Sequence, residues 1–229
     1  MKKLFLINIL LLLVKVTNAD IVMSPYLQAV TTNSIYVMVE CDNTSPVTVN
    51  YGTTTSYGSV AVSESNQSTG SSTYVHRIKL VGLNPNTVYY YQAVHGANTS
   101  SGASFRTAVN PGTPFRFTWM ADTRTGTATH DQISALLLTR NPWFSLYGGD
   151  LCASTTYTSW KAEFFRTNEL ATIAQVPFFN APGNHEAWGT TTKSFHQAPA
   201  SASGTQDYYS FDYGDLHVLV INNMVFLSL

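Results

Sequence analysis

Three short polar clusters in the second half of the chain constrain its fold most strongly. They are Asp122-Thr123-Arg124, Gly148-Gly149-Asp150 and Gly183-Asn184-His185-Glu186. Each cluster directly follows a stretch that is typical of a buried β-strand, and helical patterns separate the three. Ligands of an open parallel sheet bind beyond the carboxyl ends of its strands. The sequence therefore predicts two carboxylates, an amide and an imidazole along one edge of such a sheet.

The elements around these clusters follow a β-α-β-α-β order, which indicates a parallel sheet covered by helices. The predicted strands span residues 115–120, 143–147 and 176–180, and the predicted helices span residues 130–140 and 157–174. Ile133, Leu136 and Leu137 would form one apolar face of the first helix. A hairpin around a tight turn is predicted over residues 208–221.

The first half of the chain has a different pattern, with short strands and turn residues but no helical stretch. The predicted strands span residues 34–40, 47–52, 74–80 and 88–95. Regular short strands of this kind favour a β-sandwich. A linker over residues 108–114 contains two prolines. We therefore predict an all-β sandwich domain over residues 20–108, followed by an α/β domain over residues 114–229.

The charge of the chain excludes one class of partner. The formal net charge is -1, and only 11% of the residues are charged. Proteins that bind nucleic acid usually present a basic surface. We therefore expect no nucleic acid partner.

The first 19 residues have the features of a secretory signal peptide. A cationic start at Lys2 and Lys3 precedes an apolar run over residues 4–16, and small residues end the segment at Ala19. A membrane anchor is the alternative, but the run is shorter than the roughly 20 residues that cross a bilayer. We expect a secreted or lumenal protein, extracellular, lysosomal or vacuolar, without membrane attachment after cleavage of the signal.

Two further features suit an exported protein. Asn43, Asn66 and Asn98 begin N-glycosylation sequons in turn-like surroundings. Cys41 and Cys152 are the only cysteines of the sequence. Since they fall in different predicted domains, we expect two buried free thiols rather than a disulfide.

Residues 83–91 carry a resemblance to a known domain. Their pattern, Leu-x-Pro-x-Thr-x-Tyr-x-Tyr, resembles the tyrosine corner of fibronectin type III domains. In that corner a tyrosine hydroxyl is bonded back to the backbone. The resemblance implies a fibronectin type III-like sandwich for residues 20–108, in which these tyrosines build the core.

The strand-end clusters carry a second resemblance. Gly149-Asp150 and the Gly-Asn-His-Glu motif, in this order after Asp122, resemble the calcineurin-like metallophosphoesterases. The preceding fibronectin-like domain and the phrase over residues 209–214 narrow the resemblance to the purple acid phosphatases. It covers nearly the whole chain after the signal peptide. It implies an α/β metallophosphoesterase domain and acid phosphatase activity on phosphate monoesters.

The resemblance also implies roles for individual residues. Asp122 would bind the first metal ion, Asp150 would bridge two ions, and Asn184 would bind the second through its amide oxygen. Asn184 and His185 would contact the substrate, and His185 would help to protonate the leaving oxygen. The implied cofactors are two metal ions, iron with zinc, manganese or a second iron. Such a pair of ions polarises the phosphoryl group and activates water.

Two positions depart from the family pattern. Ala153 stands where the family has a metal-binding tyrosine, so we expect no purple chromophore in metal-loaded protein. Arg124 stands where the family commonly has a glycine. The surface habit of arginine favours an exposed loop side chain here, and the alternative is that its guanidinium binds phosphate as a fork of donors.

The resemblance also bears on the end of the chain. Three further histidines of the family would follow Leu229, so we expect a C-terminally truncated chain with underfilled metal sites and doubtful activity. The apolar run over residues 218–229 would then form an uncovered edge.

Other interpretations stay open. A strand-end aspartate can serve only as a helix N-cap, and His185 can be a buried hydrogen-bonding histidine. The alternatives for the whole chain are a phosphodiesterase of the same family and a secreted, non-catalytic binding or adhesion protein.

Overall fold

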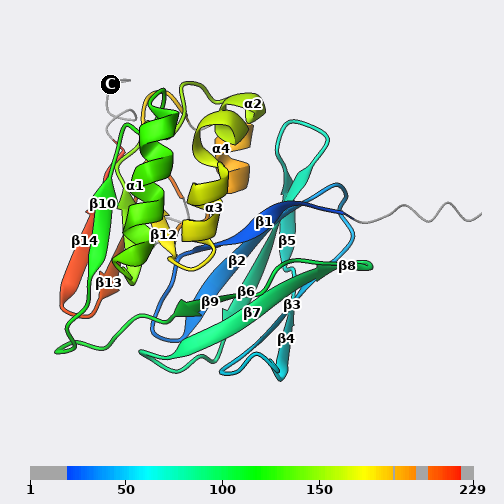
Figure 1. The fold of residues 1–229 in the computed structure, drawn as a ribbon, viewed down its shortest axis with the longest axis vertical. Coiled ribbons are helices and arrows are strands. Elements are labelled where there is room, and N and C mark those ends of the chain that lie inside the picture. Colours follow the sequence, from blue (N-terminus) through cyan, green and yellow to red (C-terminus); the bar gives the residue numbers. More distant parts are fainter. Residues whose placement is uncertain (1–19, 188, 200–205, 223–229) are drawn as a thin grey trace, which may run out of the picture.

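Two β-sheets and a set of helices make up the computed structural model, which describes residues 20–187, 189–199 and 206–222 (Figure 1). The predicted signal peptide, residues 1–19, lies outside the described residues, as does the last part of the apolar run, residues 223–229. In the described part of the chain, none of the helices has the length and apolar character needed to cross a membrane.

The larger sheet has seven strands and runs through both predicted domains. In spatial order its strands are β10 (Phe117–Met120), β11 (Phe144–Tyr147), β12 (Phe178–Asn180), β1 (Ile21–Gln28), β2 (Ser34–Cys41), β6 (Tyr74–Val81) and β5 (Ser65–Ser68). The strands β10, β11 and β12 are parallel, as predicted for the second half. Strand β12 is also parallel to β1, and the pairs from β1 to β5 are antiparallel.

The smaller sheet faces the β1–β5 part of the larger one and completes the sandwich. Its strands are β4 (Ser59–Val62), β3 (Val47–Gly52), β7 (Val88–His95), β8 (Asn98–Thr99) and β9 (Ala103–Arg106), which pairs with β7. Alternate residues of the facing strands, such as Val37, Val49 and Ile78, are fully buried between the sheets. The four strands predicted in this half are confirmed. Alternation identified them because successive side chains of a strand point to opposite faces.

The tyrosine corner is present as predicted. The Tyr89 hydroxyl accepts a hydrogen bond from the Asn84 backbone N–H at 3.0 Å. The prediction of two buried free thiols is also confirmed, since Cys41 and Cys152 are both unbridged and buried.

The predicted glycosylation acceptors differ in their surroundings. Asn43 lies in the turn after β2, whereas Asn66 and Asn98 lie in the short strands β5 and β8 and are exposed. Since Asn98 directly follows the turn at Gly96 and Ala97, the expectation of turn-like surroundings is wrong for Asn66 alone. Their modification stays a prediction.

The first helix begins earlier than the sequence pattern predicts, and the second predicted helix is divided into shorter ones. The helices are α1 (Thr127–Thr139), α2 (Tyr157–Ser159), the π-helix η1 (Trp160–Phe164), α3 (Thr167–Ile173) and α4 (Thr190–Phe195). The single helix predicted over residues 157–174 is wrong, because the chain leaves the helical conformation at Phe165 and is extended at Arg166. The neighbouring side chains of Phe164 and Phe165 are both buried in one cluster. A regular α-helix would turn adjacent side chains about 100° apart, and the break lets both pack inward.

Helix α1 packs through polar rather than apolar side chains. Ile133 and Leu136, predicted on its apolar face, are 43% and 53% exposed, whereas His130 and Ser134 are buried. Both buried side chains bond Glu169 of α3, His130 at 2.9 Å. A buried carboxylate needs such partners, so the polar stripe of α1 faces α3.

The parallel strands are covered on both faces (Figure 1). On one face, Phe178 meets Phe164 of η1, with ring centres 5.8 Å apart. On the other face lies the predicted hairpin, formed by β13 (Tyr209–Tyr213) and β14 (Leu216–Val220). There Phe179 stacks on Phe211 with ring centres 3.7 Å apart. Adjacent residues of β12 thus pack against different layers.

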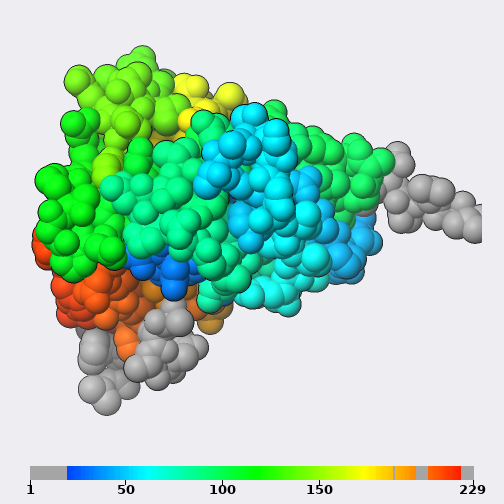
Figure 2. All heavy atoms as spheres, turned by 90° about the horizontal axis from the view of Figure 1, so that it is seen from below, coloured from blue at the N-terminus to red at the C-terminus, as the bar shows by residue number. Residues whose placement is uncertain are grey.

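The sandwich and the later elements share one sheet, so the linker does not separate them into independent parts. Their larger sheet is continuous where Gln28 of β1 lies beside Phe178 of β12. In the space-filling view the blue and cyan atoms of the sandwich and the green to red atoms of the later elements form one continuous surface (Figure 2). The predicted domain boundaries stay a prediction.

Buried polar contacts reinforce this junction. The Glu40 carboxylate, fully buried in β2, accepts hydrogen bonds from the Tyr157 hydroxyl at 2.7 Å and from Lys161 Nζ at 2.8 Å. On the neighbouring strand β6, Arg77 donates to the Lys193 carbonyl of α4 at 2.8 Å. The sandwich thereby positions the helices that follow the parallel strands.

The junction generates a stability prediction. We expect Glu40→Gln to lower the free energy of unfolding by about 2 kcal/mol, because a charge-assisted bond to Lys161 is lost inside the protein. Chemical denaturation measures the change. Asp212→Asn is the control, since Asp212 pairs with His217 at an exposed site and should change stability by less than about 0.5 kcal/mol. Equal effects of both substitutions would contradict the role given to Glu40.

Candidate active site

The structure brings the three polar clusters to one edge of the parallel strands. Asp122 follows β10, Asp150 follows β11, and Asn184 and His185 follow β12. The loops are bonded to each other, since the Asp122 N–H donates to the Gly149 carbonyl at 2.9 Å. The strands are parallel neighbours, so their carboxyl ends necessarily lie side by side.

A hollow of about 600 Å³ lies between these loops. Asp122, Asp150 and Asn184 line it, together with the backbone of Gly148, Gly149 and Gly183. The glycines leave peptide groups open to a ligand. This hollow therefore combines oxygen ligands with accessible backbone.

Arg124 contacts one residue of each of the three loops, although it is not among the residues that line the hollow. Its Nε is 2.8 Å from Asp122 Oδ1, its Nη2 is 3.4 Å from Asp150 Oδ2, and its Nη1 is 2.6 Å from His185 Nε2. The side chain is only 27% exposed. Arg124 is thus a partly exposed loop arginine that is paired with two carboxylates, and phosphate binding by it stays a prediction.

The bonds of His185 define its tautomer. Its Nδ1 lies 3.0 Å from the Ala153 carbonyl oxygen. A carbonyl only accepts hydrogen bonds, so Nδ1 carries the hydrogen. The neutral ring then offers a lone pair at Nε2, which accepts from Arg124. Nε2 is thus the atom that can gain and lose a proton toward the site.

Glu186 connects two of the loops through hydrogen bonds to their backbones. Its side chain is fully buried, and Oε2 accepts the backbone N–H groups of Asp150 at 3.0 Å and Gly183 at 3.1 Å. Oε1 accepts the N–H of Leu151. Burial raises the pKa of this carboxyl group, and the backbone bonds act in the opposite direction. The residue therefore connects the loop after β11 to the loop after β12.

The sequence pattern includes Glu186 in the last cluster but does not reveal this role. The feature that could indicate this loop-connecting role is the position of the Glu186 carboxylate directly after Asn184, which is exposed, and His185, which is partly buried. Only the structure shows that this carboxylate points away from the hollow and into the loop backbones.

The backbone of the site is strained at both candidate carboxylates. Asp122 and Asp150 have φ angles of 54° and 56°, in the left-handed region. Non-glycine residues adopt this region at a cost of the order of 1 kcal/mol, and such residues cluster at functional sites. The strain is consistent with loops shaped for a ligand rather than for simple helix caps.

The donors fit a hard cation in number and type. Two carboxylates and the amide of Asn184 are oxygen ligands of the kind that such ions bind. A positive group already lies between Asp122 and Asp150, namely the guanidinium of Arg124. A metal ion at this place requires that guanidinium to turn away. These three oxygen donors suffice for one ion rather than two.

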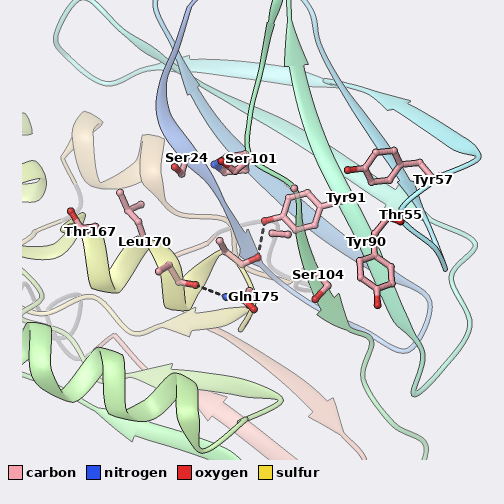
Figure 3. A pocket seen from close by; sticks show the side chains of 15 residues that line it. Ser24, Thr55, Tyr57, Tyr90, Tyr91, Ser101, Ser104, Thr167, Leu170 and Gln175 are labelled. Carbon is pink, nitrogen blue, oxygen red and sulfur yellow. Dashed lines mark hydrogen bonds between the residues drawn. The ribbon is translucent and has the colours of Figure 1, made fainter.

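A larger hollow lies elsewhere, between the sandwich and α3 (Figure 3). Its volume is about 750 Å³, and Tyr57, Tyr90, Tyr91, Leu170 and Gln175 are among the residues around it. The Tyr91 hydroxyl is already used, since it donates to the Ala174 carbonyl at 2.8 Å. None of its lining residues is charged. It therefore lacks the groups that bind phosphate or a hard ion.

Comparisons with known proteins agree with this architecture. Residues 24–107 match the family model of the purple acid phosphatase N-terminal domain. Two curated proteins of Mycobacterium tuberculosis, uncharacterized proteins MT2654 and Rv2577, are each 28% identical over 207 aligned residues, which are 75% of this chain. The chain spans 39% of the length of these relatives.

Solved structures show the same fold. Purple acid phosphatase PPD1 from yellow lupin seeds has a TM-score of 0.68 at 18% identity, over 85% of this chain and 43% of its own. The structure of PhoD has a TM-score of 0.65 at 12% identity, over 86% of this chain and 50% of its own.

The chain therefore has a fold shared with purple acid phosphatase PPD1 and PhoD. More particularly, the fold is purple acid phosphatase-like, and residues 24–107 match the N-terminal domain model of that family. The resemblance predicted from the strand-end motifs and the tyrosine corner is confirmed.

The close fit of the loops generates a second prediction. A Cβ at Gly183 would lie 2.1 Å from Asp150 Oδ1 and 2.4 Å from its backbone nitrogen. We expect Gly183→Ala to cost about 2 kcal/mol or more of unfolding free energy, because the loops must move apart. Denaturant titration measures it. Gly126→Ala is the matched control, since a Cβ there meets nothing within 4 Å. A Gly183→Ala protein as stable as this control would contradict the fit.

Proposed function

We propose that this chain belongs to a metal-dependent phosphatase that hydrolyses phosphate monoesters. The reaction would take place at the site formed by Asp122, Arg124, Asp150, Asn184 and His185, here called the strand-edge site. The convergence of Asp150, Arg124 and His185 at one point carries the proposal. A carboxylate that attracts a cation, a fork of N–H donors and a titratable imidazole are the groups that phosphoryl transfer requires.

Asp122, Asp150 and Asn184 would hold the metal. The ion would be iron, zinc or manganese, and the whole enzyme would hold two, one of them iron. When bound, it supplies Lewis-acid polarisation of the phosphoryl group and activates water. With three oxygen donors among the described residues of this edge, we expect low turnover from this chain by itself.

Arg124 would bind the phosphate. Its guanidinium is paired with carboxylates in the structure, and a planar fork of N–H donors matches phosphate oxygens equally well. We propose that Arg124 exchanges the carboxylates for phosphate oxygens when an ion and substrate arrive. Arg124 would thus bind phosphate from a position at which the family commonly has a glycine.

His185 would deliver the proton. Its Nδ1–H is fixed on the Ala153 carbonyl, which leaves Nε2 facing Arg124. In its protonated form Nε2 can donate to the oxygen that leaves as the ester bond breaks. Asp150 Oδ2 lies 4.0 Å from Nε2.

Binding and hydrolysis test the proposal on the full chain. We expect manganese-loaded protein to bind inorganic phosphate in a calorimetric titration and to cleave an aryl phosphate monoester slowly. Asp150→Asn and His185→Gln should each weaken phosphate binding at least about tenfold, which is about 1.4 kcal/mol. His217→Gln is the matched control, because His217 also pairs with an aspartate but at an exposed hairpin site.

Two results would overturn the proposal. One is phosphate binding that is absent or insensitive to Asp150→Asn and His185→Gln. The other is faster cleavage of an aryl phosphodiester than of the monoester, which would move the substrate class to diesters.

A further inference from the structure

A group of side chains of the types that bind metal ions lies inside the sandwich. Its residues belong to the first half of the sequence, whereas those of the strand-edge site belong to the second. Cys41 ends β2, His76 lies on β6, and His95 ends β7. One ligand atom from each lies within 4.8 Å of the others, and all three residues are fully buried. The strands that carry them belong to the two facing sheets (Figure 1).

Strand alternation explains why these side chains meet. On β2, Val37 and Val39 point into the sandwich core, and Cys41 continues the same face. On β6, the core residues Ile78 and Leu80 place His76 on the inner face as well. On β7, His95 is in phase with the core residue Ala93.

The imidazoles have unused ligand atoms. In the part of the chain that the structure describes, neither ring nitrogen of His95 has a hydrogen-bond partner, and neither has Nδ1 of His76. Buried polar atoms are bonded in most proteins, because an unpaired one costs free energy. Both imidazoles belong to the group around Cys41, in which one ligand atom of each residue lies within 4.8 Å of the others.

The remaining bond of His76 is the one that a metal ligand makes. Its Nε2 lies 2.9 Å from the Asn43 carbonyl oxygen. A carbonyl accepts only, so Nε2 carries the hydrogen and Nδ1 keeps a lone pair. Metal-bound histidines commonly donate their other N–H to a backbone carbonyl, which fixes the ring.

We propose that Cys41, His76 and His95 form a structural zinc site at this end of the sandwich. Thiolate and imidazole donors select zinc over magnesium or calcium. Zinc bonds of about 2.0–2.3 Å require ligand atoms roughly 3.5 Å apart, so shifts of about 1 Å suffice. Asp42 Oδ1, 3.9 Å from His95 Nδ1, is the candidate for the fourth ligand.

The site would act on the fold rather than on a substrate. It is closed to solvent, as structural zinc sites are, and it would link β2 and β6 of one sheet to β7 of the other.

Cobalt and zinc titrations of the chelator-treated full chain test the proposal. Cobalt should give a thiolate-to-cobalt charge-transfer band and tetrahedral ligand-field bands at a ratio of one ion per chain. Equimolar zinc should abolish these bands and raise the melting temperature. None of the ligands proposed for the strand-edge site is a thiol, so Asp150→Asn should leave the thiolate band unchanged.

Variants locate the site. Cys41→Ser should remove the thiolate band, and His95→Gln should weaken zinc binding about 100-fold or more. Cys152→Ser is the matched control, because Cys152 is also buried and free but lies outside the group. Circular dichroism of each metal-free variant shows whether it remains folded. If Cys41→Ser does not fold, His95→Gln and the wild-type titration decide.

The proposal fails if the folded wild-type chain shows no thiolate band with cobalt. It also fails if Cys152→Ser removes the band, or if zinc raises the melting temperature equally in the wild-type and His95→Gln proteins.

Discussion

The buried carboxylate of Glu186 is the interaction on which the strand-edge site depends. It receives backbone N–H groups from the loop after β11 and from the loop after β12. Charge-assisted bonds of this kind compensate for the removal of the carboxylate from water. They also fix the backbone of Asp150 in its left-handed conformation beside Gly183. A site built in this way exists before any ligand arrives.

The junction between the sandwich and the later elements gives this site a rigid base. Strand β12 continues the sheet of the sandwich at Gln28, and the polar contacts of Glu40 and Arg77 hold the helices against it. The N-terminal half is therefore a structural part of the site's support. A zinc ion between its sheets would strengthen the same half from within.

The sequence predicted those features that depend on local periodicity. The strands of the sandwich alternate inward and outward residues, and the polar clusters mark the ends of β10, β11 and β12. The tyrosine corner was predictable because its residues lie within nine positions, from Leu83 to Tyr91.

Features that depend on distant partners could not be predicted in this way. The break at Phe165 and the polar face of α1 follow from the burial of Phe164 with Phe165 and from the position of Glu169. The pairing of β12 with β1 joins residues 150 positions apart. At the site, the residue types were visible, but the contacts of Arg124 were not, because they involve three partners from three loops.

We propose that the strand edge binds a cation and phosphate, and that the Arg124 guanidinium moves to make room for the metal ion. Anomalous X-ray diffraction from crystals soaked with manganese and inorganic phosphate tests this most directly. The account predicts an anomalous peak within bonding distance of Asp150 and Asn184, with the Arg124 guanidinium moved onto a phosphate. A peak absent from this edge at full manganese loading, with Arg124 still paired to Asp122 and Asp150, would contradict it.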